Sequence, residues 1–565
     1  MEEKHTTQNV SKLIENVALW VLVVYAFTVP VLFLPFVAAN VFDFPKWLLT
    51  AVTAVLLLIL TGVYMVTEKK VILPAKQYLV PICLFIVAVL ASVFFSSSNK
   101  IALLYGKAGL LLSFAVILFS ALVIVRKKIN RVFYSLLLSS FILSWIQVFT
   151  FLEILPNILR GPIFAQKTFT PIGSQLALAS FLSIILPMSV MYALKTKDAA
   201  KKIFYFVVVG LQTVALVFAI AQLLPGQPAN PKFLPFSSGW SIAMDQLKTG
   251  RTALFGVGPD KFAIAFSKFR PAILNQSEDW VVRFGSSSNE WLTVFTTMGV
   301  LGLAAFVILS LTFAKKAFEV KTKSPVHSAL TLGFTVSLVL LMLIPGNIGV
   351  YIPFFMLGLL LVTSSRQGEV VYNNDKLSLV AALPLIALPL FLAFFVVKAA
   401  MAEVAFGQSL VYASENKGGE TYRSQIRAIT LNPYIANYRL AYSNTNLALA
   451  NSLASKEELT DEDRQNITQL VSQSIREAKA AVALDPQNVS SWANLAQIYR
   501  QLINFAEGAD QWAVSSYVQA IRLDNTNPQL RLDLGGLLYS LNSYEEAVDQ
   551  FKQAIALKPD FANAY

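Results

Sequence analysis

The residue types best suited to chemistry gather in one polar segment, residues 224–289, between long apolar stretches. The segment carries seven basic residues against four acidic ones, and three of the basic residues are Arg251, Arg270 and Arg283. A guanidinium group presents a planar fork of donors that fits a phosphate, whereas contact with lipid headgroups explains a lysine here better. Arg270 and Arg283 flank a turn at Asn275–Trp280. We therefore predict that these two face inward together and bind an anionic group such as a phosphate, with Arg251 as a third contact.

A glycine pair interrupts this segment at Gly256-Val257-Gly258-Pro259. Gly256 and Gly258 permit either a tight turn or a close approach of the backbone to a ligand, and a plain turn is the favoured interpretation. Short amphipathic helices are predicted on both sides, and we expect their apolar faces to lie in the membrane interface. These faces consist of Trp240, Ala243 and Leu247 before the turn and, after a Pro259-Asp260 start, Phe262, Phe266 and Phe269.

Long apolar stretches must position the polar segment. The chain of 565 residues is 56% hydrophobic and 14% charged, against about 25% charged in an average soluble protein. This composition excludes a soluble globular enzyme and a disordered chain. Eleven stretches reach or approach the roughly 20 residues that a membrane-spanning helix needs, and the tenth is the weakest. They lie near 14–36, 45–67, 76–97, 102–125, 132–152, 173–194, 203–223, 290–314, 327–345, 348–364 and 377–400.

Lysine and arginine gather in alternate short loops between these stretches. Because cytoplasmic loops carry such an excess, we predict a multi-pass membrane protein with a cytoplasmic N-terminus. Residues 224–289 and 402–565 then lie on the extracytoplasmic side, although a missed or false span in the last third would reverse the placement of the tail. The net charge of +12 belongs to the membrane half of the chain, so nucleic-acid binding is not expected.

Metal and cofactor chemistry has little support in the sequence. Cys83 is the only cysteine, which excludes a disulfide and a cysteine-based metal site within one chain. The two histidines, His5 and His327, are both cytoplasmic in the predicted topology. We therefore expect neither a metal ion nor a cofactor.

The C-terminal residues fit a 34-residue helical repeat. In residues 528–561 the signature consists of Leu534-Gly535, Ala547, Phe551, Ala554 and Pro559, and the preceding unit has Trp492, Leu495, Ala496, Tyr499, Ala513, Tyr517 and Ala520. This pattern resembles the tetratricopeptide family, whose units bind peptides or partner proteins. It predicts an α-solenoid over 489–565, after a helical linker with a degenerate repeat over 402–488. The last unit is cut short at Tyr565, so we expect that the natural protein continues or that this chain is a fragment.

Several motifs of the polar segment resemble the outer loop of the O-antigen ligase/polymerase superfamily. They are Leu234-Pro235 with Ser238–Ala243, Phe255–Pro259 with Phe262, Phe269-Arg270-Pro271, and Ser288–Leu292 followed by Gly299–Gly302. The similarity spans roughly residues 70–365 and includes a helical hairpin at 327–364. It implies an all-α fold, with a GT-C-like membrane domain over residues 1–401 ahead of the tetratricopeptide solenoid, a fusion known in this superfamily.

The resemblance also implies an activity and its site. It implies a metal-independent, inverting glycosyl transfer outside the bacterial cytoplasmic (inner) membrane, from a lipid-linked oligosaccharide on undecaprenyl pyrophosphate. The acceptor would be a lipid core, another lipid-linked glycan, a teichoic-type polymer or a protein. In this superfamily, arginines hold the pyrophosphate of the donor. The resemblance implies the same role for Arg270, Arg283 and Arg251. Further substrate contacts would come from Asn289, Gly256 and Gly258.

The sequence departs from this family at Ser288, which takes the place of a histidine proposed to assist the acceptor hydroxyl. A neutral serine cannot act as a base unaided. One alternative is that a carboxylate acts as the base, with Glu290 as the preferred candidate and Asp260 as the next. Another is that catalysis rests only on positioning of the substrates and on departure of the pyrophosphate. The third is that the protein is catalytically dead. Asn289 has a structural alternative, because asparagine is a good helix N-cap. An active ligase would have a cavity, open to the outer leaflet, lined by Arg270, Arg283 and Glu290.

Two other functions compete with this one. The first is a catalytically degenerate, membrane-anchored scaffold that holds its repeats outside to recruit envelope proteins. The second is a transporter or flippase, which is less favoured because the apolar stretches contain few charges and show no internal repeat.

Overall fold

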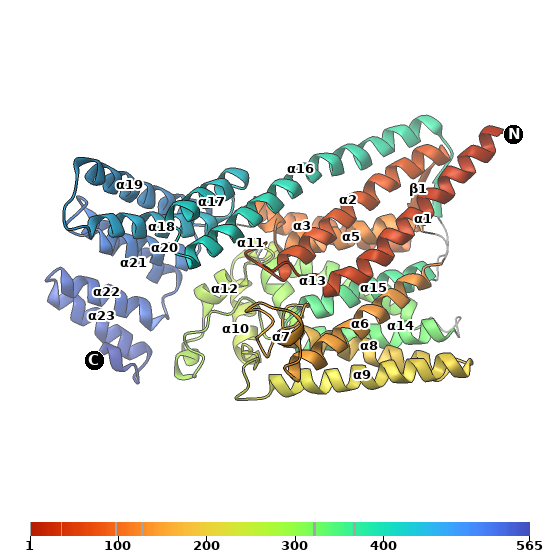
Figure 1. Ribbon diagram of the computed structural model, residues 1–565, viewed down its shortest axis with the longest axis horizontal. Coiled ribbons are helices and arrows are strands. Elements are labelled where there is room, and N and C mark those ends of the chain that lie inside the picture. The colour runs from red at the N-terminus through yellow and green to blue at the C-terminus, as the bar shows by residue number, and fades with distance from the viewer. Residues whose placement is uncertain (1, 36, 97–98, 126–127, 320–323, 365–368) are drawn as a thin grey trace.

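The computed structural model describes residues 2–35, 37–96, 99–125, 128–319, 324–364 and 369–565 of an almost entirely α-helical protein (Figure 1). A bundle of long helices forms one part of the molecule, and a stack of shorter paired helices extends from one end of it. The predicted helices form over all eleven apolar stretches. They are α1 (Glu2–Val31), α2 (Asp43–Glu68), α3 (Lys76–Phe95), α5 (Lys107–Ile124), α6 (Asn130–Phe151), α8 (Gln175–Lys195), α9 (Ala199–Leu223), α13 (Glu290–Ala317), α14 (Pro325–Leu343), α15 (Ile348–Ser364) and the first half of α16 (Asp375–Ser414).

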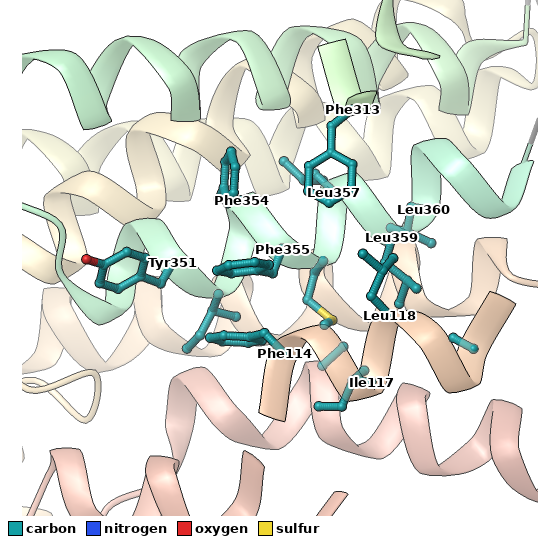
Figure 2. Close-up of a cluster of buried hydrophobic side chains, with 14 of the residues drawn as sticks. Phe114, Ile117, Leu118, Phe313, Tyr351, Phe354, Phe355, Leu357, Leu359 and Leu360 are labelled. Carbon is teal, nitrogen blue, oxygen red and sulfur yellow. The ribbon is translucent and has the colours of Figure 1, made fainter. Parts of the chain in front are cut away.

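Helix α15 is short and lies at the centre of the bundle. Within the described residues, ten other helices are long and apolar enough to cross a membrane, by length and composition. Helix α15 is apolar on all sides and packs against α5, α8, α13 and α14, as a helix with no polar face must. Phe114 of α5 stacks on Phe355 of α15, with ring centroids 4.5 Å apart (Figure 2). That the bundle spans a membrane stays a prediction.

The structure also contains a short antiparallel ribbon that the sequence did not predict. Strand β1 (Val71–Pro74) pairs with β2 (Glu369–Tyr372), with Val71 opposite Tyr372. The ribbon is at the end of the bundle away from the solenoid (Figure 1). Strands of four residues next to long apolar helices carry too little alternation to be recognised by periodicity.

Helix α13 is broken at Gly299, whose φ is +68°. A break frees carbonyl groups of the preceding helical turn, which then need other donors. The glycine turn of the polar segment supplies them: Val257 N–H donates to the Thr296 carbonyl at 3.3 Å, and Gly258 N–H to the Thr297 carbonyl at 2.9 Å. The polar segment is thereby joined to the broken helix through backbone hydrogen bonds.

Two glycines permit this close approach. A Cβ atom on Gly256, which has a φ of +72°, would lie 2.2 Å from the carbonyl carbon of Thr297. A Cβ atom on Gly299 would lie 2.4 Å from the carbonyl of Leu254. The interpretation of Gly256 and Gly258 as a structural turn is therefore supported, and the backbone that they bring close is that of α13.

The polar segment folds around a small core of its own. Its helices are α10 (Phe236–Gln246), α11 (Gly250–Phe255), α12 (Phe262–Phe269) and the 3-10 turn η1 (Ala272–Gln276), while α4 (Lys100–Leu104) and α7 (Leu155–Ile158) lie in other loops. Phe262 and Phe266 are 0% and 1% exposed and pack with Leu234, Ile242 and Phe284. The prediction that this aromatic face lies in the membrane interface is therefore wrong, because the segment buries it internally.

The C-terminal part is a stack of helix pairs that begins within α16. The second half of α16 pairs with α17 (Gly418–Leu431), and the pairs α18 (Ala436–Ala454) with α19 (Asp461–Leu484), α20 (Val489–Gln501) with α21 (Ala509–Leu523) and α22 (Pro528–Ser540) with α23 (Tyr544–Leu557) follow, before η2 (Ala562–Ala564). A Cβ atom on Gly535 would lie 2.5 Å from the Phe551 ring, so the small residue lets the two helices approach. The signature positions thus act as predicted.

We predict that Gly299→Ala lowers the stability of the protein by about 2 kcal/mol or more, because a side chain there is strained at positive φ and meets the backbone of Leu254. Thermal unfolding of the purified protein in detergent measures the effect. Gly210→Ala in α9 is the matched control, since its Cβ atom would have no neighbour within 4 Å. Equal unfolding midpoints for the two variants would contradict the proposed constraint.

Candidate functional site

The polar segment holds the solenoid at the turns that join successive helix pairs. These inter-repeat turns are residues 485–488, 524–527 and 558–561. Lys261 forms an ion pair with Asp485 in the first turn, with Nζ and Oδ2 2.6 Å apart. Trp280 packs edge-on against Phe561 in the third turn, with ring centroids 5.1 Å apart. The solenoid is therefore fixed to the bundle along one edge.

Asn275 is the centre of this loop–solenoid interface and is fully buried. Its side-chain nitrogen donates to the carbonyl oxygens of Thr526 at 2.8 Å and Leu557 at 3.2 Å. Its side-chain oxygen accepts from Arg270 Nη2 at 2.8 Å. Its backbone carbonyl accepts from Lys558 Nζ at 3.0 Å. One asparagine therefore joins the polar segment to two inter-repeat turns.

Arg270 and Arg283 lie near each other, as predicted, but on the side of the segment that faces the repeats. Arg270 also donates to the carbonyl of Trp280, and Arg283 donates to Ser490 Oγ at the start of α20. Burial lowers the pKa of the Arg270 guanidinium. The same burial raises the pKa of nearby Asp524, against the pull of both arginines. These guanidinium groups hold protein groups in this structure, and their phosphate-binding role stays a prediction.

Arg251 lies apart from the other two arginines. It belongs to α11, and its Nε donates to the carbonyl of Phe95 at the end of α3, at 2.5 Å. This contact joins the polar segment to a bundle helix. The structure thus separates the three arginines into two places, neither of which is the cavity described next.

A cavity of about 720 Å³ lies where the bundle, the polar segment and the start of the solenoid meet. Lys107 and Asp260 line it, together with Asp43 and Tyr351 from the bundle and Glu403 from the second half of α16. None of the three arginines lines this cavity. This cavity is therefore not the expected one lined by Arg270, Arg283 and Glu290, because the two arginines are engaged at the solenoid.

Glu290 is buried behind the wall of this cavity, 1% exposed. Its Oε1 lies 2.8 Å from Lys107 Nζ, and its Oε2 accepts from the Gly346 N–H at 2.9 Å. Both carboxylate oxygens therefore already have donors. Lys107 and Gly346 separate Glu290 from the open space and line the cavity themselves.

Asp260 is the predicted carboxylate that faces the cavity directly. Its side chain is open to the cavity and enclosed by protein on its other sides. Burial raises the pKa of this carboxyl above its ordinary value, although Lys107 and Lys261 lie near enough to oppose the shift. A carboxyl with a raised pKa exchanges protons closer to neutral pH, which suits a general base or acid. The catalytic roles of Asp260 and Glu290 stay predictions.

Asn289 and Ser288 have structural partners. Asn289 caps α13, since its Oδ1 accepts from the Leu292 N–H at 2.9 Å, which supports the capping alternative. Ser288 Oγ donates to the carbonyl of Pro235 at 3.0 Å. The residue at the position of the family histidine thus ties α10 to the start of α13, away from the cavity lining.

Sequence reasoning missed Lys107, Asp43 and Glu403 as site residues. Lys107 had a signal, because it is one of the few basic residues in the short loops predicted to lie outside. Asp43 and Glu403 stand far apart in the sequence, one between the first two predicted spans and the other just after the last, and only the fold brings them to one cavity. Within the described residues no group of three or more histidine, cysteine, aspartate or glutamate side chains could hold a metal ion.

We predict that Asn275→Ala releases the solenoid from the polar segment. The change leaves buried backbone carbonyls without donors and should cost about 2–3 kcal/mol at this interface. Hydrogen exchange of the inter-repeat turns in the purified protein should become faster, while exchange in the bundle stays the same. Exposed Gln276→Ala is the neighbouring control. Unchanged protection of residues 524–527 in the Asn275 variant would show that this asparagine does not hold the solenoid.

Comparison with known proteins finds matches to part of the chain. Residues 535–565 match the family described as TPR repeat. Tetratricopeptide repeat protein 5 of Homo sapiens and that of Mus musculus are each 38% identical over 96 residues, which are 16% of this chain and 22% of the relative. The chain thus covers 22% of the length of these curated relatives.

Two solved structures are also similar over part of the chain. The crystal structure of MamA protein has a TM-score of 0.23 and 16% identity and covers 29% of this chain and 77% of its own. A thermophilic TPR protein of Thermus thermophilus has a TM-score of 0.24 and 19% identity, and the match covers 34% of this chain and 88% of that protein's chain. Neither these relatives nor these structures support the O-antigen ligase resemblance, which stays a prediction. The C-terminal part of the chain thus contains a TPR repeat at residues 535–565, and such repeats generally mediate protein–protein interaction.

Proposed function

We propose that this protein is a membrane-anchored scaffold that presents tetratricopeptide repeats to a partner protein outside the cytoplasmic membrane. The observation that carries the proposal is how the solenoid is attached. The inter-repeat turns face the polar segment, whereas the first helices of the repeats keep exposed polar side chains. These side chains include Asn444 on α18, Gln497 and Arg500 on α20, and Gln529 on α22.

The first-helix face carries a set of connected polar groups. Asn494 Nδ2 donates to Asn444 Oδ1 at 3.1 Å, which joins two successive units. A Cβ atom on Gly536 would lie 4.0 Å from a guanidinium nitrogen of Arg500, so this arginine reaches the next unit. Amide and guanidinium groups offer donors to the carbonyl and carboxylate oxygens of a bound segment. This polar face supports recognition of a partner protein.

The anchor is supported by the arrangement of the two parts. The first half of α16 is apolar and mostly exposed, as a lipid-facing helix would be, and the same helix continues into the solenoid. The polar segment and the solenoid lie at one end of the bundle, and the N-terminus lies at the other (Figure 1). This arrangement fits the predicted topology, in which both long polar pieces are extracytoplasmic.

We predict that a photoreactive residue at Gln497 crosslinks one defined partner protein in intact cells. The same residue at Lys552, an exposed position on α23, is the control and should give no such adduct. In the Gln497 background, Arg500→Ala should reduce the adduct about tenfold, as the loss of an interface arginine does. Adducts of equal strength from both positions, or none from Gln497, would contradict the scaffold proposal.

Glycosyl transfer is a second candidate function, and the cavity favours it. Asp260 and Lys107 line this cavity, and Lys107 pairs there with the buried Glu290. Asp260 and Glu290 are the two predicted catalytic residues. In such a reaction the acceptor oxygen would attack the anomeric carbon of the donor sugar, the pyrophosphate would leave with the bonding electrons, and Asp260 would accept the hydroxyl proton. The carboxyl with the raised pKa is the one open to the cavity, which fits that role.

We predict that Asp260→Asn lowers transfer from a lipid-linked oligosaccharide by about 10²–10⁴-fold, the usual contribution of a general base. Glu278→Gln, at an exposed carboxylate of the polar segment outside the cavity lining, should retain most of the activity. Product formation by purified protein in detergent, resolved by electrophoresis, measures both variants. An inactive wild type with bacterial lipid-linked donors would leave the scaffold as the better proposal, and an active Asp260 variant would remove this base.

A further inference from the structure

The cavity has the wrong charge for a free anion. Among its lining residues, Asp43, Asp260 and Glu403 are acidic, and Lys107 is the basic member. Lys107 already neutralises Glu290 across 2.8 Å. The remaining lining charge is therefore negative, and a negative wall in a partly enclosed space favours a cation over a phosphate.

The carboxylates are held at different depths and by different elements. Glu403 is 9% exposed, and its two oxygens accept from the Asn40 N–H at 2.8 Å and the Tyr438 hydroxyl at 2.6 Å. Asp43 and Asp260 form no ion pair within the described part of the chain. They lie near enough that the charge of Asp43 helps to raise the pKa of Asp260. Two carboxylates without an ion-pair partner among the described residues thus face the same space, although Lys107 and Lys261 lie near Asp260 and Lys46 lies near Asp43.

Unpartnered polar atoms lie in the wall of this space. Trp47 is 8% exposed and lines the cavity, and its indole Nε1 has no hydrogen-bond partner among the described residues. The side-chain oxygen of Asn347, another lining residue, has none either. Tyr351 also lines the cavity, and its hydroxyl, which Figure 2 shows pointing away from the apolar cluster, lies next to the Glu290 carboxylate. A buried polar group without a partner is costly, so the indole and amide atoms point to a ligand that supplies the missing hydrogen bonds.

Aromatic rings and amides complete the wall. Phe44 stacks on Trp47 with ring centroids 5.7 Å apart, and Tyr105 meets Trp47 edge-on at 5.9 Å. Phe44, Trp47 and Tyr105 all line the cavity, as do the amide side chains of Asn40, Asn347 and Asn437. Aromatic faces pack against the C–H face of a sugar ring and attract cations. Amide side chains both donate hydrogen bonds to hydroxyl groups and accept hydrogen bonds from them.

We propose that this cavity binds a sugar that carries a protonated amine, with the ammonium group between Asp43 and Asp260. The aromatic wall takes the ring, and the amides and the Trp47 indole N–H take its hydroxyl groups. The binding step requires neither glycosyl transfer nor a partner protein. It holds whether the protein acts as a scaffold or as an enzyme.

The ligand would touch both parts of the protein. Asp43 and Tyr351 belong to the bundle, Asp260 to the polar segment, and Glu403 and Asn437 to the start of the solenoid. Occupation of the cavity therefore stabilises the junction from which the repeats extend. Hydrogen exchange around residues 403–437 should slow when the ligand binds.

The test measures binding of glucosamine to the purified full-length protein in detergent, at a pH below the amine pKa, by calorimetry and by the shift in thermal unfolding. N-acetylglucosamine and glucose are the matched probes, because they keep the ring and lack the positive charge. We expect glucosamine to bind at least about tenfold more tightly than either, as a charged hydrogen bond contributes. Equal binding of the three sugars, or no binding of glucosamine at millimolar concentration, would overturn the proposal.

Variants locate the site. Asp43→Asn and Asp260→Asn should each weaken glucosamine binding about tenfold and leave the binding of glucose unchanged, which also reports that the variant is folded. Glu278→Gln, an exposed carboxylate of the polar segment outside the cavity lining, is the charge-matched control and should bind as the wild type does. Wild-type affinity for glucosamine in both aspartate variants would place the amine elsewhere and refute the assignment. The binding measurements contain no lipid-linked donor. They therefore report amine binding independently of any transfer activity.

Discussion

The hydrogen bonds at the break in α13 fix the polar segment on the bundle. A helix that breaks at Gly299 must satisfy the freed carbonyls of Thr296 and Thr297, and the glycine turn of the polar segment does so with two backbone donors. After this turn the chain continues to Asp260, which lines the cavity, and then to Asn275, which contacts the solenoid. One backbone constraint therefore places both the candidate ligand site and the attachment of the repeats.

Positive charge in the polar segment acts mainly inside the protein. Arg270 and Arg283 hold a carbonyl group, an amide oxygen and a hydroxyl group near the inter-repeat turns, and Arg251 holds a carbonyl at the end of α3. A guanidinium fork suits neutral acceptors in a protein interface as well as phosphate. An excess of arginine in an outer loop consequently does not by itself identify an anion site. The cavity next to it has the opposite charge.

Glu403 connects the two halves of the molecule. It lies where α16 leaves the bundle and becomes the first helix of the solenoid, and it accepts hydrogen bonds from Asn40 of the bundle and Tyr438 of α18. Rigid continuation of one helix, together with this buried carboxylate, orients the repeats relative to the cavity. The proposed partner binding on the repeats and the proposed ligand binding in the cavity would therefore act on the same junction.

The sequence by itself determined the helices and the repeats. Runs of about 20 apolar residues and the spacing of Leu534, Gly535 and Ala547 are local signals, because helix formation and the approach of two neighbouring helices depend on nearby residues. The cap at Asn289 and the turn at Gly256 were also readable, since their cause lies within a few positions. Only the tertiary structure decided which faces are buried and which charges meet. Phe262 points into a local core, the arginines face the repeats, and Asp43, Asp260 and Glu403 share one cavity, because these contacts join elements that are distant in sequence and leave no periodic trace there.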